Sequence, residues 1–302
     1  MKNYLTIAIP IFNGAKYISQ TLDAIVKQKN VDVVISDNNS TDETKKILKK
    51  YSEKYTNIRI NFNPTNIGFD LNLRQCVELC NTDYVWLLTD DDIIRDGAVE
   101  VINKIIKNNS NNKGYGLIYV DNLPEYSGIK DVKFGSDPNK FFEYTKFRSG
   151  GMSSNIINRK LWKNLDFKKY TNDWPHLVYS IITLTHSNYY IHFESLKSEI
   201  DPNMPKRWLN NSSLFRYLQS LKKTFEIMKN YSIYSISTIK KTEKIVSKHI
   251  STSIIIEKKN KKKITFNQII FVLCNSRFYL FKNIILLICP SFLYEILKNF
   301  NK

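Results

Sequence analysis

The sequence has few cysteines and glycines, and it has no long uninterrupted apolar run. Four cysteines and nine glycines in 302 residues exclude the disulfide-rich and collagen-like classes. The cysteines lack metal-site or CxxC spacing, so we expect free thiols in a reducing cytosol. Charged residues and a proline interrupt the most apolar stretch, residues 278–297, so no membrane-spanning helix is expected. The first ten residues favour a buried strand over a signal peptide.

The chain is rich in apolar and basic residues, and the basic ones are unevenly placed. A hydrophobic content of 42% and an aromatic content of 13% exclude disorder as the main state. Residues 206–302 hold 19 basic and 4 acidic residues, whereas residues 1–205 hold 26 and 24. Of the formal charge of +17, +15 therefore belongs to the last third of the chain. Its expected partner is acidic: a membrane surface, a phosphorylated substrate or nucleic acid.

Short apolar runs alternate with helical patterns over residues 1–122. Strands are expected at residues 5–10, 31–36, 58–62, 84–88 and 116–120, and helices at 15–28, 42–55, 68–80 and 96–108. This alternation predicts an α/β fold with a doubly wound, mostly parallel sheet, whose ligands bind beyond the carboxyl ends of the strands. Residues 123–205 are less regular and form a second half. After residue 205 the pattern becomes helical, which predicts domains 1–205 and 206–302.

Three adjacent carboxylates, Asp90, Asp91 and Asp92, follow the strand expected at residues 84–88. Such groups repel one another unless a cation is present. Mg²⁺ or Mn²⁺ typically takes one or two carboxylates together with phosphate oxygens, so the triplet indicates a metal–diphosphate site. The alternative is a solvated acidic turn that caps the next helix.

Asp37 and Asn39 follow the second strand and indicate a contact with a base or ribose. The alternative is a turn with a helix cap from Ser40 or Thr41. Together with the acidic triplet, Asp37 and Asn39 predict a nucleotide that lies across the switch point of the sheet. The chain has neither a GxGxxG nor a GxxxxGK[ST] motif, so a dinucleotide fold and a P-loop are not supported.

Four stretches, residues 6–14, 34–42, 66–68 and 84–92, together resemble the GT-A glycosyltransferases of family 2 over about residues 4–205. The resemblance implies inverting transfer of a sugar from a nucleoside diphosphate sugar, with Mn²⁺ or Mg²⁺ as cofactor. The chain is similar in particular to transferases that build bacterial surface polysaccharides, such as O-antigen, capsule or lipooligosaccharide. The implied nucleotide-sugar contacts are Pro10, Phe12, Asn13, Asp37, Asn39, Asn66, Gly68, Asn72 and Asp90.

The resemblance also implies that Asp91 and Asp92 belong to the metal-binding DxD region. Thr89 stands where the usual Asp-x-Asp-Asp pattern begins, which leaves the register open. We favour Asp90 on the ribose side and Asp91 or Asp92 on the metal.

The family's general base is matched by the segment 171–176, where Asn172 replaces the usual Glu and Asp173 is the candidate base. An inverting reaction needs a group that takes the proton of the acceptor hydroxyl. The alternative role of Asp173 is an N-cap for the following helix, and His176 and Asp166 are the nearest other bases.

Acceptor or diphosphate contacts are expected from Gly151, Trp174, His176 and Arg207. Each also has a structural interpretation: a tight turn for the glycine, core packing for Trp174 and His176, and a solvated charge for Arg207.

The basic helical tail predicts peripheral association with the inner face of the cell membrane. That suits a cytoplasmic enzyme with a lipid-linked or glycan acceptor. The tail is otherwise a helical subdomain or a homo-oligomer interface, and nucleic acid is not favoured because no recognition motif is present. The rival functions are an inactive sugar-nucleotide-binding scaffold, a nucleotidyltransferase and a basic membrane-binding structural protein.

Overall fold

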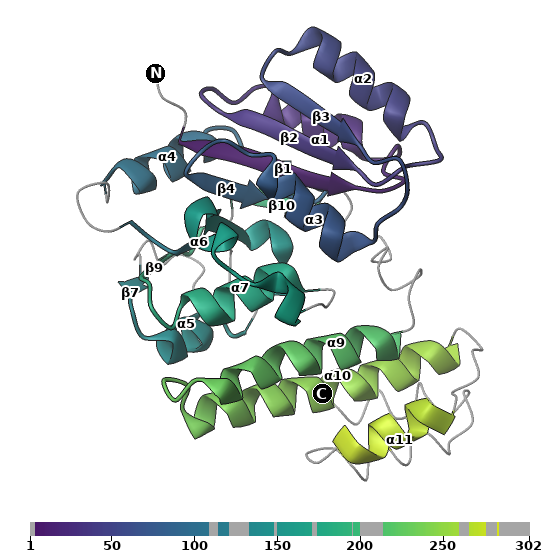
Figure 1. Cartoon of the computed structure of the whole chain (residues 1–302), viewed down its shortest axis with the longest axis vertical. Coiled ribbons are helices and arrows are strands. Elements are labelled where there is room, and N and C mark those ends of the chain that lie inside the picture. Colours follow the sequence, from purple (N-terminus) through teal and green to yellow (C-terminus); the bar gives the residue numbers. More distant parts are fainter. Residues whose placement is uncertain are drawn as a thin grey trace. The chain divides into compact units, whose positions relative to one another are not determined.

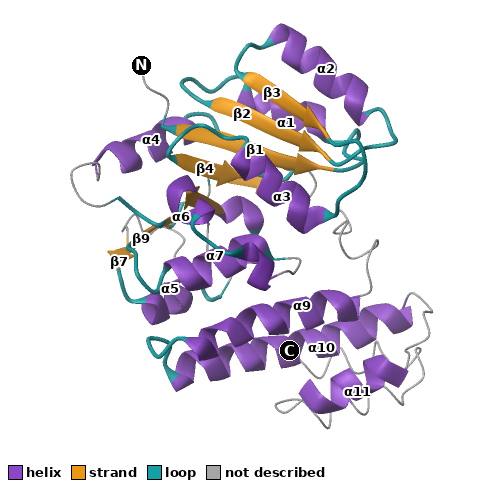
Figure 2. Ribbon diagram, in the orientation of Figure 1, coloured by secondary structure: helices purple, strands orange, loops and turns teal. Residues whose placement is uncertain are grey.

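The computed structural model describes residues 4–108, 114–120, 133–147, 150–170, 174–194, 196–199, 214–259, 266–275 and 283. Internal contacts divide the chain into two compact units, Met1–Asn203 and Met204–Lys302. The first unit is α/β and the second is helical (Figures 1 and 2). The predicted fold class is therefore confirmed.

Four parallel strands form one half of the large sheet in the order β3-β2-β1-β4. They are β1 (Leu5–Ile11), β2 (Asp32–Asp37), β3 (Ile58–Phe62) and β4 (Tyr84–Leu87). Helices α1 (Ile18–Ile25), α2 (Thr44–Lys54) and α3 (Phe69–Glu78) connect them. Every residue of β1 is buried, as expected of a strand covered on both faces. In Figure 1, α3 lies in front of the sheet and α1 behind it.

The core beneath α1 follows from the alternation of side chains along β1. Leu5, Ile7, Ile9 and Ile11 point to one face, where they join apolar residues of α1 and of α4 (Ala98–Asn108) in a single buried cluster. The intervening Thr6 lies on the other face, and its hydroxyl is 2.7 Å from that of Thr82.

An antiparallel insertion extends the sheet on the other side of β4. Strand β8 (Asn155–Asn158) lies antiparallel between β4 and β6 (Leu117–Val120). Strand β9 (Tyr189–His192) follows parallel to β6, and β7 (Lys133–Gly135) closes the edge. The helices of this half are α5 (Pro138–Tyr144), α6 (Arg159–Lys163) and α7 (Pro175–Thr183), with 3₁₀ turns η3 (Met152–Ser154) and η4 (Phe167–Tyr170).

A two-stranded antiparallel sheet stands apart from the large one. It pairs β5 (Asp92–Ile94) with β10 (Lys197–Glu199), two segments distant in sequence. The sequence does not predict this sheet, because three-residue strands carry too little periodicity to be recognised. The pairing fixes the chain directly after the acidic triplet.

The second unit contains α9 (Leu214–Glu226), the 3₁₀ turn η5 (Ile227–Asn230), α10 (Ile236–Lys259) and α11 (Phe266–Asn275). Helix α9 packs along α10, and apolar residues of both, such as Leu218 and Ile250, are buried. Among the residues that the structure describes, no helix is long and apolar enough to cross a membrane.

Candidate active site

The carboxyl ends of the parallel strands β1, β2 and β4 lie at the same end of the sheet (Figure 2). The chain runs from β1 to β2 and β3 on one side, then returns to place β4 on the other side of β1. This reversal creates a switch point between β1 and β4, where open α/β sheets bind their ligands. The loops that follow β1, β2 and β4 carry most of the predicted site residues.

The loop after β1 is tied to the loop after β2 by side chains from both. Asn13 has a left-handed backbone with φ of 51°, and its N–H donates to the Ser40 hydroxyl at 2.9 Å. Its side-chain oxygen accepts the N–H of Thr41 at 2.8 Å. Pro10 is buried, whereas Phe12 is 43% exposed at the tip of the loop. Phe12 is therefore accessible to a ligand, and the neighbouring Asn13 is also exposed.

The same two loops are joined again at the start of α1. The N–H of Gly14 donates to the Thr44 hydroxyl at 2.9 Å, and that of Ala15 to Asp42 at 3.2 Å. Burial alone raises the pKa of Asp42, but the hydrogen bonds from Thr44 and Ala15 outweigh it and lower the pKa below its usual value. These contacts fix the segment that precedes α1 against the segment after β2.

Asp37 is fully buried and caps the turn after β2. Its carboxylate accepts the Ser40 N–H at 3.1 Å and also the Ser40 hydroxyl. Asn39 has φ of 60°, and its side-chain oxygen accepts Lys45 Nζ at 2.7 Å. The turn interpretation is thus visible in the structure, and the contact of Asp37 or Asn39 with a nucleotide stays a prediction.

An asparagine cluster organises the next loop. Asn38 donates to the side-chain oxygen of Asn66 at 2.8 Å, and that oxygen also accepts the N–H of Gly68 at 2.9 Å. The Asn38 oxygen accepts the N–H of Ile67 at 2.9 Å. Gly68 begins α3 with φ of 84°, a conformation that favours glycine. The predicted residues Asn66 and Gly68 are therefore held against the end of β2.

Asn72 lies behind that loop, on the first turn of α3. Its oxygen accepts the Ser36 hydroxyl at 2.7 Å and Asn63 at 2.9 Å, and its amide donates to the Ser36 carbonyl at 2.9 Å. With 2% of Asn72 exposed, these bonds favour support of the loop over direct contact with a nucleotide. Asn63, which directly follows β3, is not among the predicted contacts, although it belongs to the polar segment 63–68 that follows this strand.

The acidic triplet presents its members differently. Asp90 is 8% exposed and Asp92 is 5% exposed, whereas Asp91 between them is half-buried. The Asp90 carboxylate packs so closely under the β1 loop that a Cβ at Gly14 would overlap its Oδ2 atom. The Asp90 carbonyl accepts the Thr21 hydroxyl at 3.0 Å. Asp91 is consequently the most accessible carboxylate of the three.

Asp92 belongs to a chain of hydrogen bonds that runs through Thr89 to Ser153. The hydroxyl of Thr89 donates to Asp92 Oδ2 at 2.8 Å, and the Thr89 N–H donates to the Ser153 hydroxyl at 3.0 Å. Lys197 Nζ lies 3.5 Å from the same Oδ2. Ser153 also accepts Trp86 Nε1 at its carbonyl, at 2.9 Å. The triplet is thus linked to the 150–154 segment on one side and to β10 on the other.

These residues fit a hard divalent cation that is shared with a phosphate ligand. Within the described part of the chain, no group of three or more acidic, histidine or cysteine side chains is placed to hold an ion. Mg²⁺ and Mn²⁺ are commonly held by one or two carboxylates, with phosphate and water completing the shell. Asp91 is half-buried at the carboxyl end of β4. This position suits an ion that takes its other ligands from phosphate and water rather than from the protein.

The residues expected to contact the acceptor lie in the segment at Gly150 and at the start of α7. His176 is 3% exposed, and its Nε2 lies 2.9 Å from the Gly150 carbonyl. Burial lowers the pKa of His176 to about 4, although the Gly150 hydrogen bond opposes this shift. A neutral His176 therefore donates to Gly150 near pH 7 and fixes the turn that contains Gly151.

Trp174 packs against the same turn. It is 7% exposed, and a Cβ at Gly150 would lie 3.2 Å from its ring. Most of the Trp174 side chain is therefore packed in the core, which is one of the two roles expected for it. Asp166 lies exposed between α6 and η4. Asp173 and Arg207 lie outside the described residues, so their roles stay predictions.

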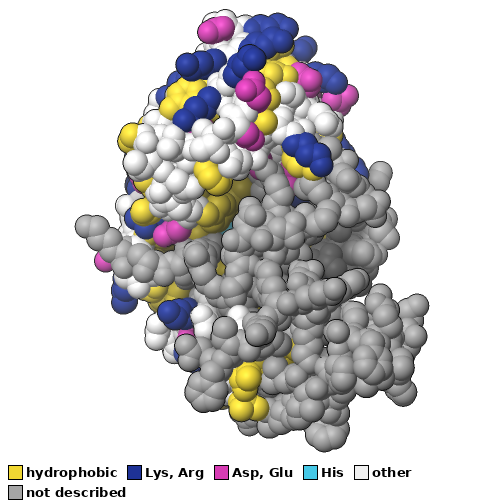
Figure 3. Space-filling model, turned by 90° about the vertical axis from the view of Figure 1, so that its right-hand side faces the viewer, with side chains coloured by type: hydrophobic (Ala, Val, Ile, Leu, Met, Phe, Trp, Pro, Cys, Tyr) yellow, Lys and Arg dark blue, Asp and Glu magenta, His cyan; other side chains and the backbone are white. Residues whose placement is uncertain are grey.

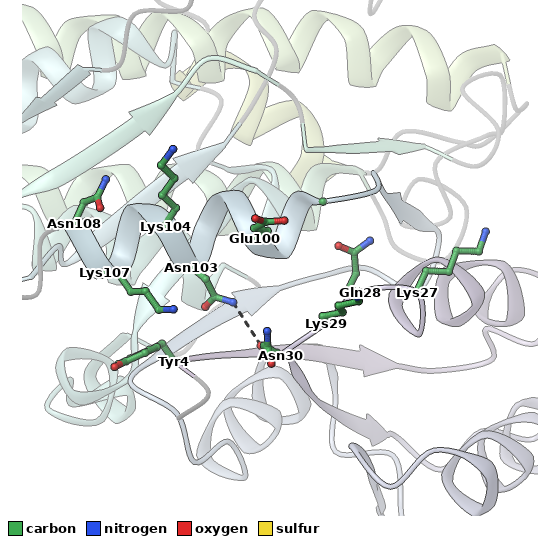
Figure 4. Close-up of a pocket in the computed structure, with 11 residues that line it drawn as sticks. Tyr4, Lys27, Gln28, Lys29, Asn30, Glu100, Asn103, Lys104, Lys107 and Asn108 are labelled. Atoms are coloured by element: carbon green, nitrogen blue, oxygen red, sulfur yellow. Dashed lines mark hydrogen bonds between the residues drawn. The ribbon is translucent and has the colours of Figure 1, made fainter. Parts of the chain in front are cut away.

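A hollow of about 700 Å³ lies at the opposite end of the strands (Figure 4). It is lined by residues that precede β1 and β2, such as Tyr4 and Asn30, and by α4. Four lysines and one glutamate surround it. On the molecular face of Figure 3, the Lys and Arg side chains of the described residues are interspersed with Asp and Glu. The residues that line the hollow do not include the acidic triplet.

Comparison with known sequences places residues 6–173 in one family model, described as Glycosyl transferase family 2. Abequosyltransferase RfbV of Salmonella typhimurium is 24% identical over 185 residues, which cover 54% of this chain and 55% of the relative. The dTDP-rhamnosyl transferase RfbG of Shigella flexneri is 29% identical over 170 residues, covering 53% and 56%. The match thus spans about half the length of these relatives.

Solved structures share the fold. TarS 1-349 of S. aureus, in complex with UDP-GlcNAc, superposes with a TM-score of 0.67 at 16% identity and covers 90% of this chain and 80% of its own. The mannosyltransferase PcManGT from Pyrobaculum calidifontis, in complex with GDP-Man and Mn²⁺, has a TM-score of 0.57 at 11% identity, with coverage of 100% and 88%. At these identities the likeness shows the fold alone.

Proposed function

Because the chain belongs to glycosyl transferase family 2, we propose that it transfers a sugar from a nucleoside diphosphate sugar to a glycan or lipid-linked acceptor. The observation that carries the proposal is the acidic triplet after β4, at the switch point between β1 and β4. Relatives named as abequosyl and dTDP-rhamnosyl transferases support a place in bacterial surface-polysaccharide synthesis.

The donor nucleotide is proposed to lie along the loops after β1, β2 and β3. Exposed Phe12 offers an apolar face to a base, and Asp37 and Asn66 stand at the ends of the strands that would flank base and ribose. The hydrogen bonds that hold Asn13 and Asn38 prearrange these loops before a ligand arrives. Such prearrangement lowers the ordering entropy that binding must overcome.

The diphosphate is proposed to meet Asp91 through Mn²⁺ or Mg²⁺. A bound divalent cation supplies positive charge to the leaving diphosphate. The chain's own contribution is to hold Asp91 at the accessible edge, while Asp90 and Asp92 are fixed beneath it by Thr21, Thr89 and Lys197. Arg207 is proposed as an additional contact to the diphosphate.

Asp173 is proposed to take the proton of the acceptor hydroxyl as that oxygen attacks the anomeric carbon, with inversion. Its support is its place in the sequence, directly before Trp174 and the amino end of α7. The buried His176 is a poor competitor for this role, since its Nε2 is bound to Gly150. The turn around Gly151 is proposed to approach the acceptor sugar, because glycine lets a ligand come close to the backbone.

The lysine-rich helices of the second unit are proposed to associate with an anionic membrane surface on the cytoplasmic side. Helices α9 and α10 expose lysines such as Lys223 and Lys240, and Ile236 at the start of α10 is an exposed apolar side chain near Lys240 in sequence. Each basic residue near an anionic surface contributes about 1 kcal/mol. Binding of this kind is reversible and brings the enzyme to a lipid-linked acceptor.

A thermal-shift panel tests the donor proposal. The folded protein is melted with UDP, GDP, CDP or dTDP, each with and without Mn²⁺. A ligand that binds only the native state raises the melting temperature by mass action. A shift that needs both one nucleotide and the metal supports the transferase and names its donor class. Absence of any shift in the folded protein contradicts the donor site. Hydrolysis of the sugar nucleotide would separate the transferase from an inactive sugar-nucleotide-binding scaffold, and release of diphosphate from a nucleoside triphosphate would instead indicate a nucleotidyltransferase.

A further inference from the structure

We propose that Lys197 is a positioning residue of the donor site, which neutralises Asp92 and so leaves Asp91 as the carboxylate that meets the cation-bound diphosphate. This inference rests on the proposed function of the site. It assigns different roles to two adjacent aspartates and adds a residue from the far end of the first unit.

The contact between Lys197 and Asp92 is largely shielded from water. Nζ lies 3.5 Å from Asp92 Oδ2, and the two side chains are 18% and 8% exposed. The same oxygen accepts the Thr89 hydroxyl at 2.8 Å. One carboxylate oxygen thus faces a cation and a hydrogen-bond donor, both supplied by the protein.

The backbone holds Lys197 in this place. In the β5–β10 sheet, Lys197 is paired with Ile94, and Asp92 is paired with Glu199. Asp92 and Lys197 are therefore diagonal neighbours on one face of the ladder, a spacing that long side chains can bridge. The Arg95 N–H donates to the Leu196 carbonyl at 2.9 Å and extends the pairing. The short sheet therefore fixes the position of Lys197 relative to Asp92.

The charge of Lys197 changes what the triplet offers to a ligand. Adjacent carboxylates oppose one another's ionisation, and an ammonium group relieves that repulsion permanently. Without Lys197, Asp92 would be a shielded carboxylate with its charge uncompensated, which is strongly unfavourable. It would then repel an incoming diphosphate or turn toward the cation beside Asp91. The pair therefore protects both the charge and the geometry of the donor site.

A double-mutant cycle tests this role. Calorimetry measures the Kd of the nucleoside diphosphate that responds in the thermal-shift panel, with Mn²⁺, for wild type, K197Q, D92N and the double variant. We expect K197Q to weaken binding at least about tenfold. The double variant is expected to bind within about threefold of D92N, because without the Asp92 charge there is no carboxylate for Lys197 to neutralise. Lys197→Arg, which keeps the charge, restores most of the affinity.

Two controls separate positioning from stability. Lys163 pairs with Glu78 at 3.2 Å on the same unit, but the side chains are 41% and 50% exposed, so K163Q should leave the Kd unchanged. Melting each variant without ligand reports a purely structural effect, which would lower stability without moving the Kd of the folded fraction. D91N should abolish metal-dependent binding, while D92N retains it.

Two results would overturn the inference. If D92N abolishes binding as fully as D91N, and the double variant binds no better than K197Q, then Asp92 is itself a ligand. If wild type binds the nucleotide but K197Q has the same Kd, Lys197 has no role in the donor site. Failure of wild type to bind any nucleotide removes the proposed function itself, and the inference with it.

Discussion

The imidazole Nε2 of His176 lies 2.9 Å from the carbonyl oxygen of Gly150. The histidine sits at the start of α7, and the glycine precedes η3 and the strand β8. The contact therefore connects two segments of the proposed acceptor side. Because burial lowers the pKa of His176 to about 4, the imidazole is neutral over the physiological pH range. It acts as a fixed donor rather than as a proton carrier.

Acidification should destabilise the first unit through His176. The pKa rises from about 4 in the folded state to the ordinary 6.5 on unfolding, so the unfolded chain binds more protons between these values. Stability is fully present above pH 6.5 and falls toward pH 4, by about 3 kcal/mol for this group. Urea unfolding of wild type and H176Q at pH 7, 5.5 and 4 measures the difference. Parallel losses in both proteins would show that His176 does not cause the pH dependence.

Gly14→Ala should lower both stability and nucleotide affinity. The added Cβ would overlap Asp90 Oδ2 and lie 2.6 Å from Ile11 Cδ1, so the β1 loop must move. Overpacking of this kind typically costs about 1–3 kcal/mol. Gly97→Ala is the matched control: its φ of +76° strains an alanine, but nothing lies within 4 Å. Thermal melting with and without nucleotide should show a loss of response in G14A alone, and an equal response in both would contradict the role of the loop.

The parallel half of the sheet could be predicted from sequence because its signals are local. The buried strands β1 and β4 are continuous apolar runs, and amphipathic helices separate the parallel strands. The rule that ligands bind at carboxyl ends then selects Asp37 and Asp90 without any knowledge of distances. The expected helix at residues 15–28 is longer at both ends than α1, which runs from Ile18 to Ile25.

The partners of the site residues could not be predicted, since they depend on contacts between distant segments. The pairing of Asp92 with Lys197 needs two three-residue strands to meet. Asn72 on α3 is buried because it bonds Ser36 of β2, which is distant in sequence. A polar residue after a strand has the same appearance in sequence whether it contacts a ligand or supports a loop. Only the spatial arrangement separates Asp91 from its two more deeply buried neighbours.

Asp91→Asn should abolish metal-dependent nucleotide binding while leaving the fold intact. The side chain is half-buried, so the substitution removes a charge without opening a cavity. Asp96→Asn is the control, because Asp96 is exposed beyond β5. The measurement is the shift in melting temperature that the responding nucleotide gives with Mn²⁺. A full shift in D91N would remove Asp91 from the metal site.

Asp173→Asn should retain donor binding and lose sugar transfer. If Asp173 takes the proton of the acceptor hydroxyl, asparagine cannot replace it, and a positioned base contributes about 10²–10⁴-fold to such a step. Asp166→Asn is the matched variant, since Asp166 is the nearest other carboxylate that the sequence analysis considered and it lies exposed before η4. Calorimetry with the nucleotide measures donor binding, and release of nucleoside diphosphate in the presence of acceptor measures transfer. Both variants should bind the donor like wild type, and only D173N should lose transfer. If D166N loses transfer and D173N retains it, the base is Asp166, and Asp173 has the alternative role of capping α7.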